Sequence, residues 1–201
     1  MNLSKYAQMN NKLINKNIQK SIQLKQEILS NTALLETINQ VAQKIITCFK
    51  EYKGKVLFCG NGGSAADSQH LAAELSGRYY YDRPPLFAEA LHVNTSYLTA
   101  VANDYGYEEV YSRMVEAIGK KGDILLALST SGNSKNIIRA IEKANSLGLI
   151  TIGFSGNDGG AMQNLCKYNL IIPSDNTARI QEAHILVGHI ICKMIEQKLF
   201  S

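Results

Sequence analysis

Apolar residues recur at helical spacing through the first quarter of the chain. Residues 4–30 are otherwise polar and contain neither glycine nor proline, which predicts a long amphipathic helix with a narrow apolar stripe. Residues 32–52 carry a denser stripe that ends before Gly54, which predicts a second helix. One α/β sheet does not require two helices before its first strand. We therefore expect the first stripe to pack against a partner subunit; folding back onto the chain's own sheet is the alternative.

Short apolar runs of strand length alternate with helical patterns from residue 54 onward. The expected strands cover residues 55–59, 87–93, 124–128, 149–154 and 169–172. The expected helices between and after them cover residues 65–75, 110–118, 136–147 and 178–198. This alternation predicts one α/β domain over residues 1–201, with N-terminal helices in residues 1–53 and an α/β core in residues 54–201. Ligands of parallel α/β sheets bind beyond the carboxyl ends of the strands.

Composition narrows the choice of partners and compartment. The chain of 201 residues is 45% hydrophobic and 19% charged, and its formal net charge of +4 includes no block of Lys and Arg, so we expect no nucleic-acid or membrane partner. No stretch has the pattern of a signal peptide or a membrane span, so we expect a cytoplasmic protein. Widely spaced cysteines, expected to be reduced, occur at Cys48, Cys59, Cys166 and Cys192.

The loop after the third expected strand has the composition of a phosphate site. The apolar run at residues 124–128 stops at Ser129-Thr130-Ser131-Gly132-Asn133-Ser134, and a helical pattern follows. Such a loop presents backbone N–H groups at the positive end of a helix, together with several hydroxyl groups, to an anion. The same residue types are also common in ordinary turns and helix caps, so this loop alone does not decide the function.

A glycine-rich loop follows the first expected strand. Gly60-Asn61-Gly62-Gly63-Ser64-Ala65 matches one version of the dinucleotide-binding fingerprint. That interpretation requires an acidic residue at the end of the second strand, whereas the candidate at about the right distance, Asp82, precedes that strand. A nicotinamide enzyme would also not need a second phosphate loop at residues 129–134. We therefore favour a loop that closes over a sugar or a phosphate.

Histidines with polar neighbours occur in two of the expected helices. His70 and Glu74 lie four residues apart, so they share a helix face and could bind a divalent metal or act as an acid/base pair; a surface contact is the alternative. In the last helix, Gln181 lies between His184 and His189 on the helical wheel, so spacing does not decide which imidazole faces a site with Gln181. A histidine buried in the core is the alternative for either one.

In combination, these motifs resemble the phosphoheptose isomerases, or sedoheptulose 7-phosphate isomerases, of the sugar isomerase (SIS) domain superfamily. From the second helix to the C-terminus the motifs are CGNGGS at 59–64, HxxxE at 70–74, AND at 102–104, STSGNS at 129–134 and RIQExH at 179–184, followed by His189. The resemblance implies a five-stranded parallel sheet between helices and a homotetramer with active sites near subunit contacts. It also implies interconversion of D-sedoheptulose 7-phosphate and D-glycero-D-manno-heptose 7-phosphate through a cis-enediol, which supplies heptose for bacterial surface polysaccharide such as lipopolysaccharide or capsule.

The resemblance also implies roles for individual residues. One zinc ion per subunit is expected, held by His70, Glu74, Gln181 and His189, so the resemblance chooses His189 where spacing left two histidines open. Glu74 would be the base that moves a proton between C1 and C2, and His189 would move protons among the sugar oxygens or assist ring opening. The expected substrate contacts are Asn61, Gly62, Gly63, Glu74, Asn103, Asp104, Ser129, Thr130, Ser131, Ser134 and Gln181.

A non-catalytic binding protein is the competing interpretation. One group of SIS proteins binds the bacterial replication initiator DnaA and shares the serine loop and the RIQE motif. That group lacks the acid of HxxxE and the second histidine of the last helix, and both are present here as Glu74 and His189, which favours the enzyme. SIS regulators that sense sugar phosphates usually carry an added DNA-binding domain, which we do not expect in this chain.

Overall fold

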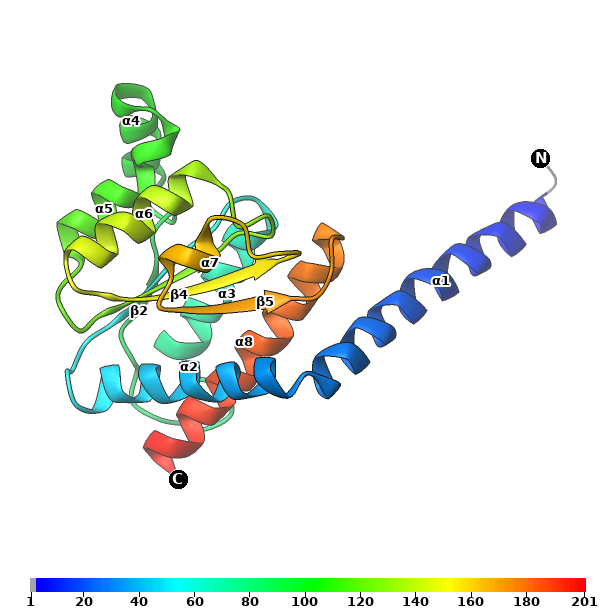
Figure 1. Ribbon diagram of the computed structural model, residues 1–201, viewed down its shortest axis with the longest axis horizontal. Helices are drawn as coiled ribbons and strands as arrows, with labels where there is room; N and C mark the ends of the chain where they lie inside the picture. The colour runs from blue at the N-terminus through cyan, green and yellow to red at the C-terminus, as the bar shows by residue number, and fades with distance from the viewer. Residues whose placement is uncertain (1–2) are drawn as a thin grey trace.

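A five-stranded parallel sheet lies at the centre of the molecule (Figure 1). The computed structural model describes residues 3–201, with side chains from residue 8 onward. Neighbouring strands are parallel throughout the sheet, as the alternating pattern predicts. In the spatial order β2-β1-β3-β4-β5, the strands are β2 (Ala88–Ala90), β1 (Val56–Cys59), β3 (Ile124–Leu128), β4 (Ile150–Gly156) and β5 (Tyr168–Ile172).

Helices cover both faces of this sheet (Figure 1). One layer comprises α2 (Thr32–Lys50), α3 (Gly63–Ser76) and α8 (Thr177–Phe200). The opposite layer comprises α5 (Val110–Ile118), α6 (Lys135–Ser146) and α7 (Met162–Leu165). Alternate residues of β1 belong to the two layers, since Val56 and Phe58 join the first core whereas Leu57 and Cys59 join the second. Because residues on both faces are buried, the sequence of this strand is a continuous apolar run.

The strand order brings the two ligand-type loops together. The chain passes from β1 to β2 on one side and then to β3 on the other side of β1, so the direction of strand addition reverses between β1 and β3. The ends of these strands are level, because Cys59 is paired in register with Ala127. The glycine loop after β1 and the serine loop after β3 therefore leave the same edge at the switch point, where parallel α/β sheets bind ligands.

Most of helix α1 (Leu3–Ser30) projects away from the body of the protein (Figure 1). Its last turns pack on the core through Leu24 and Ile28, and Arg179 Nη1 donates a 2.8 Å hydrogen bond to the carbonyl of Asn17. The apolar side chains nearer the N-terminus are each more than half exposed: Met9, Leu13, Ile14, Ile18 and Ile22. Packing of α1 against its own chain therefore buries only the C-terminal end of the apolar stripe. The rest of the stripe is not buried by residues 8–201 of the same chain.

The sequence pattern overestimates β2 and does not predict helix α4 (Thr95–Tyr105) or the single turn of α7. Strand β2 pairs only with β1, and the pairing ends at Ala90 because Cys59 is paired with β3 alone. Helix α4 is capped by Asn94, whose side-chain oxygen accepts a 3.0 Å hydrogen bond from the backbone N–H of Tyr97. That cap was the available signal for α4, which continues into the 3-10 helix η1 (Tyr107–Glu109).

Two further expectations concern the cysteines and membrane spans. Cys48, Cys59, Cys166 and Cys192 are free thiols, as predicted, and all except the half-buried Cys166 are buried. None of the helices within residues 3–201 combines the length and the apolar composition that crossing a membrane would require.

Candidate active site

A cavity of about 310 Å³ opens where the glycine loop and the serine loop meet. Its wall is completed by the first turns of α8, through Thr177 and Gln181. The loop residues that line it are Asn61, Gly62, Gly63, Ser64, Leu128, Ser129, Thr130 and Ser134. Apart from Leu128, the wall therefore consists of hydroxyl, amide and backbone groups, and residues 8–201 contribute no lysine or arginine to it.

The serine loop is held in shape by its own hydrogen bonds. Ser129 Oγ donates to Ser134 Oγ at 3.1 Å, and the backbone N–H of Gly132 donates to the carbonyl of Ser129 at 2.9 Å. Gly132 adopts φ +66°, and a Cβ at this position would collide with the carbonyl oxygen of Gly159, so only glycine fits. Helix α6 begins directly after this loop, which directs the positive end of its dipole toward the cavity.

Ser131 belongs to an adjoining cavity rather than to the first one. This second cavity, of about 270 Å³, shares Thr130 and Thr177 with its neighbour and is also lined by Asp158 and Asp175. Of the hydroxyl residues predicted to hold a phosphate, Ser129, Thr130 and Ser134 therefore face the first cavity and Ser131 faces the second.

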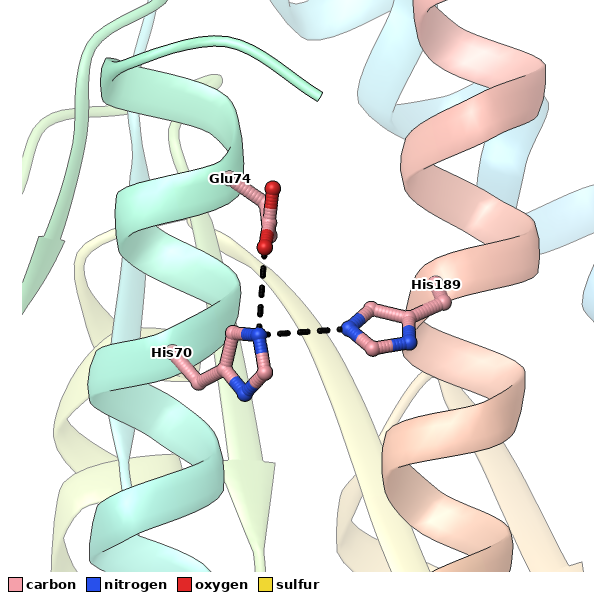
Figure 2. A group of neighbouring side chains, drawn as sticks. All are labelled: His70, Glu74 and His189. Carbon is pink, nitrogen blue, oxygen red and sulfur yellow. Dashed lines mark hydrogen bonds and ion pairs between the residues drawn. The ribbon is translucent and has the colours of Figure 1, made fainter. Parts of the chain in front are cut away.

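Three titratable side chains converge between α3 and α8 (Figure 2). His70 Nε2 lies 3.1 Å from Glu74 Oε1 on the same helix and 3.3 Å from His189 Nε2 on the facing helix. All three ligand atoms lie within 4.8 Å of one another. The sequence could place His70 and Glu74 on one face, but only the packing of α8 against α3 brings His189 to them.

Two glycines allow α3 and α8 to approach this closely. A Cβ at Gly188, the residue before His189, would lie 2.5 Å from a methyl carbon of Leu71 on α3. A Cβ at Gly63 would lie 2.7 Å from the amide nitrogen of Gln181 on α8. Both distances are far below ordinary van der Waals contact, so any larger side chain would move the helices or the side chains apart.

A buried carboxylate ties the same two helices together below the cluster. Glu196, on α8, accepts hydrogen bonds from the backbone N–H groups of Tyr79 and Tyr80 at 3.1 and 2.7 Å and from Arg83 Nε at 3.0 Å. Arg83 Nη2 in turn donates to the backbone carbonyl of Glu74 at 2.9 Å. Burial alone raises the pKa of Glu196, but these backbone donors and Arg83 outweigh it and leave the pKa below its ordinary value. The side chains of Arg83 and Glu196 are each 2% exposed, so this ion pair is a buried link between α8 and the segment that follows α3.

Comparison with known proteins identifies the family of this chain. Residues 18–156 match the SIS domain model. A phosphoheptose isomerase of Clostridium acetobutylicum is 51% identical over 184 residues, which are 92% of this chain and 93% of that protein. The chain belongs to the phosphoheptose isomerase family of SIS-domain proteins. A second relative, from Sulfurimonas denitrificans, is 49% identical over 94% of this chain and 97% of its own length and carries the same name.

Solved structures of the family have the same fold as this isomerase. The structure of phosphoheptose isomerase GmhA from Neisseria gonorrhoeae is 42% identical, with a TM-score of 0.87 over 93% of this chain and 98% of that chain. A phosphoheptose isomerase from Francisella tularensis is 40% identical, with a TM-score of 0.89 over 94% of this chain and 98% of that chain. The enzyme therefore has the SIS fold over almost its whole length.

The three-residue cluster of the isomerase fits a divalent metal ion. Nitrogen ligands about 2.0–2.1 Å from a zinc ion in a tetrahedral site lie about 3.3 Å from each other. The two histidine Nε2 atoms are 3.3 Å apart, and Glu74 adds an oxygen at a similar distance from His70. Burial, reinforced by the neighbouring His70, lowers the pKa of His189, which favours the neutral imidazole that metals bind. Gln181 lines the first cavity and could supply a further oxygen.

His184 points away from the site of the isomerase. It is fully buried, its Nε2 donates to the carbonyl of Ser155 on β4 at 3.0 Å, and its ring packs against Phe154. Because Nε2 carries the proton in this bond, Nδ1 is the unprotonated nitrogen, and it has no hydrogen-bond partner among the described residues. The ambiguity left by the helical wheel is thus resolved: His189 faces α3 and His184 is a core residue.

Asn103 and Asp104 lie outside both cavities. They are exposed near the end of α4, where Asn103 Nδ2 donates to Asp104 Oδ1 at 2.8 Å. Within residues 8–201 of one chain, neither residue lines the space enclosed by the glycine and serine loops.

Sequence reasoning missed several residues that shape the site. Thr177 lines both cavities, and Glu196 with Arg83 supports the cluster. An acidic residue on the apolar side of the last helix was the available signal for Glu196. Thr177 follows Asn176, whose side chain caps α8 by accepting from the backbone N–H groups of Ala178 and Arg179, and this cap marks where the helix begins at the cavity.

The stability of the isomerase should depend on pH through His184. Burial lowers its pKa from 6.5 to about 4, so as the pH falls below 6.5 the unfolded chain takes up a proton that the native chain refuses. Between about pH 7 and about pH 4.5 the wild-type protein should lose about 2–3 kcal/mol more unfolding free energy in urea than His184→Gln, which keeps an N–H donor for Ser155. Equal losses in the two proteins would contradict this assignment.

Proposed function

We propose that the enzyme interconverts D-sedoheptulose 7-phosphate and D-glycero-D-manno-heptose 7-phosphate by proton transfer between C1 and C2. The observation that carries this proposal is the convergence of His70, Glu74 and His189 on α3 and α8, the two helices whose first turns line the cavity between the glycine and serine loops. The family supplies the class of substrate, since the relatives named above are phosphoheptose isomerases.

The serine loop binds the phosphate in this proposal. Ser129, Thr130 and Ser134 present hydroxyl groups at the start of α6, where the helix dipole favours an anion. Ser131, which lines the adjoining cavity, reaches the phosphate from the other side of Thr130. Binding energy from the phosphate, far from the reacting carbons, then orients the sugar. The glycine loop, through Asn61, Gly62 and Gly63, covers the sugar chain.

Glu74 is the base that removes a carbon-bound proton and returns it to the neighbouring carbon through a cis-enediol. Its carboxylate lies next to His70 and on the helix that begins at the glycine loop. The lowered pKa of His189 keeps this imidazole neutral near pH 7, so it can accept and donate protons among the sugar oxygens or during ring opening. The two groups thus divide the carbon-bound and oxygen-bound protons between them.

One zinc ion per subunit is proposed to be held by His70, Glu74, Gln181 and His189. Zinc would supply a Lewis acid that polarises the carbonyl oxygen and stabilises negative charge. Coordination lowers the basicity of a carboxylate and occupies the unprotonated nitrogen of an imidazole, so for Glu74 and for His189 the role of ligand competes with the role in proton transfer. Tyr79, whose ring centroid lies 5.6 Å from that of His189, limits the orientations that this imidazole can adopt.

The isomerase assignment is tested by turnover of sedoheptulose 7-phosphate in deuterated water, followed by NMR. The zinc-loaded wild-type protein should form the aldose with deuterium at C2, whereas Glu74→Gln should lose at least about 100-fold in kcat because it lacks the base. Glu116→Gln is the matched control, because Glu116 is an exposed residue of α5 paired only with Lys143. No turnover by the folded, zinc-loaded wild-type protein would refute the assignment and favour a non-catalytic binding protein.

A homotetramer is proposed to cover the exposed stripe of α1. Five apolar side chains in the projecting part of the helix are each more than half exposed, and helix packing between subunits would bury them. In such an assembly, α4 of one subunit can present Asn103 and Asp104 to the cavity of another, which would make them substrate contacts. We place this assembly in the cytoplasm, where its product enters the synthesis of surface polysaccharide.

Charge introduced into the stripe should dissociate this assembly. The double variant Ile14→Glu and Ile18→Glu places two carboxylates in the proposed contact between subunits. Burying unpaired charges is unfavourable, so sedimentation velocity should show smaller species than the tetramer of the wild type. Lys12→Glu, on the opposite face of the same helix, is the control and should leave the tetramer intact. A wild-type protein that sediments as a monomer, or a double variant that stays tetrameric, would contradict the proposed interface.

A further inference from the structure

The side chains of Asn61 and Asn136 form a reciprocal amide pair between the two loops. Asn61 Nδ2 donates to Asn136 Oδ1 at 2.9 Å, and Asn136 Nδ2 donates to Asn61 Oδ1 at 2.9 Å. Asn61 belongs to the glycine loop and lines the cavity, whereas Asn136 lies in the first turn of α6 and is only 4% exposed. The pair therefore joins the loop over the sugar to the helix that follows the phosphate loop.

A backbone N–H group decides which way this pair is oriented. The N–H of Ile137 donates to Asn136 Oδ1 at 3.0 Å, and a backbone N–H can only donate. The atom of Asn136 that it faces must therefore be the oxygen, so the other terminal atom of Asn136 is the nitrogen. That nitrogen must in turn face the oxygen of Asn61, which places the nitrogen of Asn61 opposite Asn136 Oδ1.

The acceptor capacity of Asn61 is then used up. Its Oδ1 accepts from Asn136 Nδ2 and also from the hydroxyl of Tyr107 at 3.2 Å, which occupies both lone pairs of the amide oxygen. Its Nδ2 gives one hydrogen to Asn136, and one N–H remains. Tyr111, whose hydroxyl donates to the carbonyl of Gly60, holds the neighbouring part of the same loop.

We propose that Asn136 is a positioning residue that presents Asn61 to the substrate as a single hydrogen-bond donor with no free acceptor. This inference rests on the proposed function, because it takes a sugar phosphate as the ligand. An oxygen atom of the substrate, whether hydroxyl, carbonyl or phosphoryl, can accept from this N–H. A protonated amino group cannot, and it finds no lone pair on Asn61. The amide pair thus selects oxygen over an ammonium group at this position of the substrate.

A double-mutant cycle separates this role from a merely structural one. The dissociation constant of sedoheptulose 7-phosphate is measured by calorimetry for the wild type, Asn136→Ala, Asn61→Ala and the double variant. We expect each single variant to raise the dissociation constant about tenfold. The double variant should bind as well as the weaker-binding of the two single variants, because Asn136 acts through Asn61. Weakening by Asn136→Ala that persists unchanged in the Asn61→Ala background, or Asn136→Ala binding within twofold of the wild type, would overturn the proposal.

Two further variants keep the test independent of folding. Asn145→Ala removes another bridging carboxamide from α6, one that contacts Thr151 and the carbonyl of Leu165 away from the cavity, and it should leave the dissociation constant unchanged. Tyr107→Phe removes only an exposed hydroxyl and should weaken binding about threefold in the wild type but not in Asn61→Ala. The same weakening in both backgrounds would contradict the proposal even if Asn136→Ala fails to fold.

Failure of the proposed role of Asn136 can be distinguished from failure of the proposed isomerase activity. Binding requires no chemistry, so a wild-type protein that binds the sugar phosphate without turning it over would refute the isomerase and still permit the cycle. An isomerase whose cycle is additive would refute the role of Asn136 alone. Absence of binding by the wild type would overturn both.

Discussion

The close contact of α3 with α8 is the constraint on which the site depends. His70 and Glu74 come from one helix and His189 from the other, so the 3.3 Å separation between His70 Nε2 and His189 Nε2 exists only at this interhelical distance. Glycines at positions 63 and 188 permit the approach, and the buried pair of Glu196 and Arg83 maintains it. Breaking such a pair would leave a charge buried without a partner, which typically costs about 3–5 kcal/mol. The cluster is thus built by packing and held by electrostatics.

The sheet supplies the second half of the site by topology alone. Because β1 and β3 are neighbours with level ends, the glycine and serine loops meet at the point where strand order reverses. Helix α3 starts in the glycine loop and carries His70 and Glu74 about two and about three turns further along, so one helix connects this loop to the cluster. Asn136 adds a direct link between the loops. The two loops are therefore linked to each other by side chains, and the glycine loop is linked to the cluster by α3.

Local patterns predicted the parts that depend on periodicity. The buried strands follow from short continuous apolar runs, whereas the first and last helices and the pairing of His70 with Glu74 follow from spacings of three to four residues. The choice between His184 and His189 could not be predicted in this way, because a helical wheel does not show where the neighbouring helix lies. In the structure, packing against β4 buries His184, whereas His189 faces His70 on α3. Glu196 and Asn136 were missed for the same reason, since their partners lie far away in the sequence.

The metal centre proposed between α3 and α8 is tested by titrating the metal-free protein with cobalt(II) and recording its visible absorption. Cobalt in a site of low coordination number absorbs far more strongly than hydrated cobalt. We expect one ion per chain with such a band, retained in His184→Gln and lost in His189→Gln, because His189 faces His70 and Glu74 whereas His184 is bonded to Ser155 in the core. A band that survives in His189→Gln, or no band in the wild type, would contradict it.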